Sequence, residues 1–71
     1  MQNSQNKPSQ VLERGQLWKI ERGYIYIAEL GKRLIHYRML KKPEQRAALT
    51  RLVGIDELMT FLRRSQAQLI S

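Results

Sequence analysis

Hydrophobic and polar residues alternate along the middle of the chain, from Gln16 to Leu40. This period of two is typical of strands that bury one face. Glycines at positions 23 and 31 interrupt the pattern at the two expected turns, and Gly23 is expected to supply a positive φ. The pattern therefore predicts a three-stranded antiparallel meander, whose strands are QLWKIE (16–21), YIYIAEL (24–30) and RLIHYRML (33–40).

The register between these strands follows from the need to keep one face apolar, because a slip of one residue moves every side chain to the opposite face. A two-residue turn at 22–23 sets Trp18 opposite Ile27. A bulge or an odd-length loop near Gly31 sets Ile27 opposite Tyr37, whereas a two-residue loop there would bring polar residues into the apolar face. The predicted apolar face consists of Trp18, Ile20, Ile25, Ile27, Ile35, Tyr37 and Met39. The predicted outer face carries Leu17, Lys19, Tyr24, Tyr26, Leu34, His36, Arg38 and Leu40.

After the third strand the pattern changes. Pro43 cannot donate a hydrogen bond to a sheet, so the strand ends before it. The short alternating segment LTRLV (49–53) predicts a fourth strand. Apolar residues then recur at helical spacing over 55–70, with two acidic residues in the first turn, where the helix dipole favours them. The predicted fold class is α+β: a three- to four-stranded antiparallel β-meander, open or closed into a small barrel, covered by one C-terminal α-helix.

The 71 residues suit one small domain, which we assign to 15–71. The polar residues 1–14 are expected to form a disordered tail, most clearly over 1–10, although Val11 and Leu12 could pack as a lead-in. The opening residues MQNSQNKPSQ lack the apolar region of a signal peptide. No apolar run is long enough to span a bilayer, so we expect no membrane segment. The chain has no cysteine, which excludes disulfides and permits a cytoplasmic location.

The positive charge of the chain is concentrated in one stretch. The net charge is +7, and residues 32–51 contribute +6 of it, from seven cationic residues against one acidic residue. Such a concentration attracts polyanions such as nucleic acid, although it also occurs on surfaces that serve solubility alone. Within it, the segment RLIHYRMLKK (33–42) places histidine and arginine on the predicted outer face.

The sequence does not indicate an enzyme, because the reactive residues do not converge. His36 is the one histidine, and no acidic residue is predicted to orient it. One histidine without cysteine cannot form a typical zinc site, and the four glycines are isolated at turns and form no phosphate-binding loop. We therefore expect no catalytic residue, no metal and no cofactor.

Aromatic and cationic residues alternate on the predicted outer face, which suggests a site for a partner. Tyrosine on a sheet can stack on bases, and lysine and arginine can contact phosphates. These tyrosines could equally fill a half-buried sheet face. The candidate nucleic-acid-binding residues are Lys19, Tyr26, His36, Arg38, Lys41 and Lys42. The alternative is a protein-interaction module that uses the exposed sheet face or an edge strand.

Four segments carry a resemblance to a known type of domain: GQLW (15–18), GYIYIAEL (23–30), LIHYRML (34–40) and TRLVGIDELMTFL (50–62). Their order resembles small bacterial β-barrels of the Tudor, Sm or Src-homology type, over about two-thirds of the chain. The resemblance implies a binding module for RNA, DNA or protein tails and does not choose among them. A helix as long as the predicted one departs from that pattern, and no aromatic cage for methyl-lysine is apparent.

Overall fold

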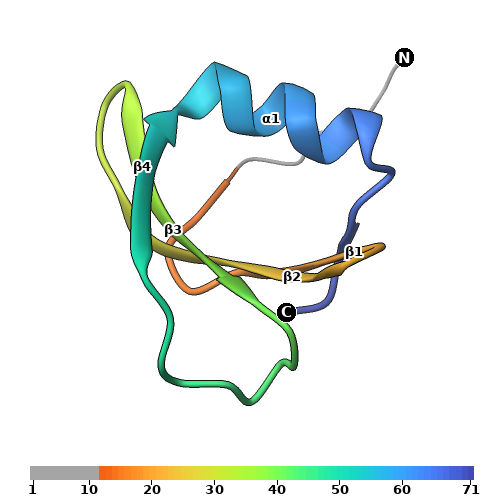
Figure 1. Ribbon diagram of the computed structural model, residues 1–71. Helices are drawn as coiled ribbons and strands as arrows, with labels where there is room; N and C mark the ends of the chain where they lie inside the picture. The colour runs from red at the N-terminus through yellow and green to blue at the C-terminus, as the bar shows by residue number, and fades with distance from the viewer. Residues whose placement is uncertain (1–11) are drawn as a thin grey trace.

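A computed structural model describes residues 12–71 of the chain, so the expectation for residues 1–10 lies outside the described residues. The described part is a five-stranded antiparallel sheet with one helix across one face (Figure 1). In chain order the elements are β1 (Leu17–Ile20), β2 (Gly23–Leu30), β3 (Leu34–Leu40), β4 (Thr50–Gly54), α1 (Ile55–Arg64) and β5 (Gln68–Leu69). The predicted α+β class is therefore confirmed.

The first hairpin is tighter than the sequence predicts. Trp18 lies opposite Ile25, and Ile20 lies opposite Gly23. The predicted partner of Trp18, Ile27, is wrong by two residues, because the turn comes one residue earlier in the chain. A shift of two residues leaves every side chain on its face, so the prediction of the faces is unaffected.

Gly23 explains this earlier turn. It adopts a φ of +150°, and a Cβ at this position would collide with the main-chain oxygen of Leu40 on β3. Only a residue without a side chain can begin β2 so close to the end of β3. Gly23 is therefore required as the first residue of a strand and not as the second residue of a turn.

The second hairpin has the predicted register. Ile27 lies opposite Tyr37 and Ile25 lies opposite Met39. The register shifts between Ile27 and Glu29, which is the irregularity expected near this turn. It lies within β2 itself rather than at the glycine that follows the strand.

The sheet has one more strand than predicted. The strand order is β4-β3-β2-β1-β5, and the sheet is open, so the small-barrel form of the prediction is wrong. The missing strand is β5, which pairs with β1 by placing Leu69 opposite Trp18. The meander therefore gains a fifth strand from the last residues of the chain, which the sequence assigned to the helix.

The helix is shorter than predicted, because it ends at Arg64 and not near residue 70. Gln66 adopts a φ of +54°, and its N–H donates to Arg63 O at 3.1 Å. Ala67 N–H donates to Leu62 O at 2.9 Å. These two bonds form a Schellman motif, which usually contains glycine at the left-handed position. Glutamine at this position gives the sequence no glycine signal for the helix end.

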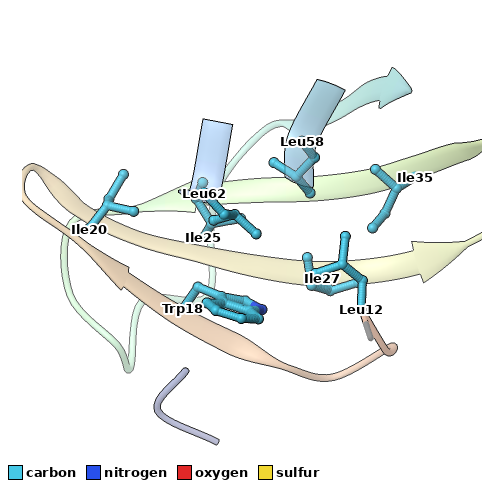
Figure 2. Packing of buried hydrophobic residues seen from close by; sticks show 8 residues of the cluster. All are labelled: Leu12, Trp18, Ile20, Ile25, Ile27, Ile35, Leu58 and Leu62. Atoms are coloured by element: carbon cyan, nitrogen blue, oxygen red, sulfur yellow. The ribbon is translucent and has the colours of Figure 1, made fainter. Parts of the chain in front are cut away.

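The core lies between the sheet and α1 (Figure 2). Ile25, Ile27 and Ile35 are fully buried, and Leu58 and Leu62 on α1 pack against the same cluster. The buried residues of this cluster are Leu12, Trp18, Ile20, Ile25, Ile27, Ile35, Leu58 and Leu62. Leu40 is also buried but lies outside the cluster, on the outer face, opposite Tyr24. Every strand residue in this cluster belongs to the predicted apolar face. Tyr37 packs at its margin, whereas Met39 is 38% exposed.

Two residues of this cluster come from β1 and from the segment before it. Leu12 is buried, so residues just before the expected boundary at 15 belong to the packed unit. Trp18 is buried too, and its indole Nε1 donates to Gln16 Oε1 at 3.0 Å, which satisfies the polar atom of the ring.

The helix that covers the core has ten residues. No helix in the described part of the chain is long and apolar enough to cross a membrane.

Candidate functional site

The outer face of the sheet, which α1 leaves uncovered, brings most of the candidate residues together. Tyr26 lies directly opposite Arg38, and Arg38 lies directly opposite Thr50 on β4. The next row of the sheet places Lys19 opposite Tyr24, which in turn lies opposite Leu40. Neighbouring rows on one face of a strand are about 7 Å apart. Aromatic and cationic side chains therefore alternate across adjacent strands.

Arg38 is held in place by its neighbour on β4. Its Nε donates to Thr50 Oγ1 at 3.1 Å, and the side chain is half-buried. Among the described residues this is the one hydrogen bond of the guanidinium, so its two terminal amino groups keep their donors. A guanidinium positioned in this way can bind a phosphate or carboxylate through two parallel hydrogen bonds.

Lys19 is positioned by an aromatic ring. Its Nζ lies 5.3 Å from the centroid of the Tyr24 ring, within the range of a cation–π contact. Lys19 is exposed and Tyr24 is half-buried. Tyr24 therefore presents the ammonium group on the outer face, and its own ring is partly covered by that group.

Lys41 and Lys42 extend the positive charge beyond the end of β3. Both are exposed, in the loop that leads to β4. Gln45 orders the loop, because its Oε1 accepts from Lys41 N–H at 2.9 Å and its Nε2 donates to Ala47 O at 2.8 Å. The two lysines directly follow Leu40, which shares a row with Lys19 and Tyr24. They therefore lie at the same end of the sheet as that row.

His36 lies apart from this group. It lies opposite Glu29 on one side and opposite Leu52 on the other. Glu29 forms an ion pair with Arg14 at 3.3 Å, which partly offsets its charge. A carboxylate and an exposed leucine do not make a phosphate site. Of the six candidates, His36 is the one that the structure places in unsuitable surroundings.

The basic stretch 32–51 does not form one patch. Lys32 and Arg33 lie in the β2–β3 turn, at the opposite end of β3 from Lys41. β3 has seven residues, which corresponds to roughly 23 Å. Arg51 lies opposite Tyr37 and so faces the helix side. Charge that is continuous in the sequence is thus divided among two ends and two faces of the sheet.

Two residues of the site are not among the six candidates that the sequence indicates. Tyr24 is predicted on the outer face but is not one of those candidates, although its contact with Lys19 gives it a role. Thr50 was assigned only to the fourth strand, and the register between β3 and β4 was needed to bring it to Arg38. Its signal, a polar residue at the start of a predicted strand, is too common to be recognised from sequence.

The helix side carries a feature that the sequence did not predict. A pocket of about 510 Å³ lies between α1 and the β3–β4 end of the sheet. It is lined by Ile25, Tyr37, Met39, Arg51, Val53, Glu57, Leu58 and Phe61. Phe61 is 42% exposed, so part of the helix remains uncovered. The described residues contain no group of three His, Cys, Asp or Glu side chains that could hold a metal ion.

These observations describe a face and a pocket and do not assign the chain to a family. The chain matches no protein-family model, no curated protein and no solved structure.

Proposed function

We propose that the protein is a non-catalytic binding module that holds nucleic acid on the outer face of its sheet. The observation that carries the proposal is the cross-strand pair of Tyr26 and Arg38, beside the row of Lys19 and Tyr24. A flat aromatic group and a fixed cation side by side match the alternation of base and phosphate in a single strand.

Each residue has a distinct role in this proposal. Arg38, oriented by Thr50, binds a phosphate through its terminal amino groups. Lys19 and the loop lysines 41 and 42 supply further phosphate contacts at the same end of the sheet. Tyr26, half-buried and without a cation over its ring among the described residues, offers a surface on which a base stacks. His36 lies at the margin and contributes least.

The resemblance to small bacterial barrels of the Tudor, Sm or Src-homology type is compatible with this proposal. Those domains are binding modules, and the present chain also has a meander, a helix and a returning strand, although its sheet is open. A chain without cysteine suits the reducing cytoplasm, which is the compartment we propose.

A second candidate function is protein binding, and the pocket on the helix side favours it. Met39 and Phe61 expose apolar surface there, which is the usual character of a protein-interaction site. The two functions use opposite faces of the sheet. Binding measurements on the two faces therefore separate them.

The proposed function predicts that oligonucleotide affinity falls steeply with salt. Every phosphate contact releases counterions, so the logarithm of the association constant should fall linearly with the logarithm of salt concentration. With about four phosphate contacts to a single strand, we expect a slope near −3. Fluorescence anisotropy with a labelled single-stranded oligonucleotide measures it. A complete lack of binding at low salt would exclude the proposal and leave the pocket as the remaining candidate.

A further inference from the structure

The free edge of β4 is the feature that points beyond nucleic-acid binding. β4 is the terminal strand of the sheet and pairs on one side with β3 (Figure 1). In the described part of the chain, no other segment forms a backbone hydrogen bond with residues 50–54. Leu52 is 55% exposed and Leu49 is 80% exposed. An open strand edge with apolar side chains is a template for pairing with another strand.

The hydrogen bond at the end of β4 identifies which backbone groups face outward. Ile55 N–H donates to Arg33 O at 2.8 Å, so this pair is a hydrogen-bonded pair of the β3–β4 ladder. Hydrogen-bonded and non-hydrogen-bonded residue pairs alternate along an antiparallel ladder. Arg51 and Val53 are therefore the residues of β4 that bond to β3. The N–H and C=O groups of Thr50, Leu52 and Gly54 then point to the open edge.

We propose that two copies of the chain join through this edge, with β4 of one copy antiparallel to β4 of the other about a two-fold axis at Leu52. Leu52 then exchanges both backbone hydrogen bonds with Leu52 of the second copy. Thr50 faces Gly54, and Arg51 faces Val53. The leucine side chains meet on the outer face, where His36 and Leu52 already lie side by side.

Charge complementarity favours a second copy over an unrelated peptide. Arg51 and Glu57 both lie at the pocket beside β4, yet the described residues contain no ion pair between them. A Cβ on Gly54 would lie 2.9 Å from Glu57 Oε1, so that carboxylate lies against the end of β4. In the proposed register, Arg51 of one copy faces Val53 of the second copy. Val53 directly precedes Gly54 of that second copy. Arg51 of each copy therefore reaches Glu57 of the other, which gives two equivalent ion pairs as an isologous interface requires.

The interface is small, so we expect reversible association at high micromolar concentration rather than a permanent dimer. Sedimentation equilibrium of the full chain without nucleic acid, over a concentration series, should show the mass rising from one copy to two. In the dimer, hydrogen exchange of the Leu52 amide should slow as concentration rises, whereas the Val53 amide is protected at every concentration. This test does not depend on the proposed function, because no oligonucleotide is present.

Leu52→Pro tests the backbone contact. It removes an N–H that faces the open edge and no bond of the β3–β4 ladder, so the fold should survive while the dimer is lost. Charge variants provide a second test that does not depend on proline. Arg51→Glu and Glu57→Arg should each weaken dimerisation by about tenfold, and the two together should restore it. Arg63→Glu changes the net charge by the same amount as Arg51→Glu and should have no effect.

Three results would overturn the proposal. A mass of one copy at every concentration means that the edge does not pair. A mass that grows beyond two copies means that β4 joins a different edge, such as β5, in an open chain. A dimer that persists in Leu52→Pro, or that the double charge reversal does not restore, uses another surface or register.

Discussion

Replacing Leu62 with alanine will lower the free energy of unfolding by about 2–5 kcal/mol. Leu62 is 5% exposed and packs from α1 against the isoleucines of the sheet (Figure 2). The change leaves a cavity in a core built from only eight buried residues. Small domains have little stability to lose, so a loss at the upper end of this range unfolds the variant. Urea denaturation followed by tryptophan fluorescence measures the effect, since Trp18 belongs to the same core.

Leu49→Ala is the matched control, because it removes the same atoms at a position that is 80% exposed. It should change the free energy of unfolding by no more than about 0.5 kcal/mol. Equal effects at the two positions would mean that α1 does not cover the sheet as described. The comparison is made at low concentration, where association through β4 is absent.

The second large effect concerns binding. Replacing Arg38, Lys41 and Lys42 together with alanine should abolish most of the oligonucleotide affinity and leave the fold intact. Lys41 and Lys42 are exposed, and Arg38 loses one hydrogen bond to Thr50. Each phosphate contact removed should flatten the log–log salt slope for a single strand by about 0.7 unit. Anisotropy titrations at several salt concentrations, with circular dichroism as a check on the fold, measure both quantities.

The control for these substitutions lies on the helix. Arg63 and Arg64 are exposed cations in the last turn of α1, on the other side of the sheet. Replacing both with alanine should reduce affinity much less than replacing Lys41 and Lys42 with alanine, a second double variant that removes the same charge. If the two double variants have the same small effect, binding depends on net charge alone, and the outer face is a solvated surface.

Much of the fold could be predicted because the faces of the sheet depend on parity. A period of two places Ile25 and Ile27 on one face and Tyr24 and Tyr26 on the other. A shift of the strand register by two residues does not change this. This is why the first hairpin could be wrong by two residues without moving any side chain to the other face. The second register was right because only an irregularity near the turn keeps Ile27 and Tyr37 on the same face.

The end of the helix could not be predicted from periodicity. Gln66 and Leu69 continue the helical spacing, yet Gln66 has a positive φ and Leu69 pairs with Trp18 in a strand. The helical spacing of Gln66 and Leu69 alone cannot distinguish a longer helix from a shorter helix that is followed by a turn and a strand. The Schellman motif ends the helix, and this sequence has no glycine there to signal it. The unpaired side of β1, which accepts β5, is a tertiary feature.

The candidate site was predicted in part, for a similar reason. Parity placed Lys19, Tyr26 and Arg38 on one face, and the structure brings them into adjacent rows. Which residues are neighbours across strands depends on the register and on the bulge, and these place Glu29 beside His36. The division of the basic stretch between two faces likewise follows from β4, where Arg51 faces the helix side.

The most direct test of the proposed nucleic-acid surface is a chemical-shift titration of the isotope-labelled protein with a short single-stranded oligonucleotide. If the outer face binds, the amide shifts should reverse on addition of salt. The largest shifts are expected at Lys19, Tyr24, Tyr26, Arg38, Lys41 and Lys42. Amides that line the pocket under α1, such as those of Val53, Leu58 and Phe61, should move little. Shifts confined to that pocket, or an absence of shifts at low salt, would contradict binding on the outer face.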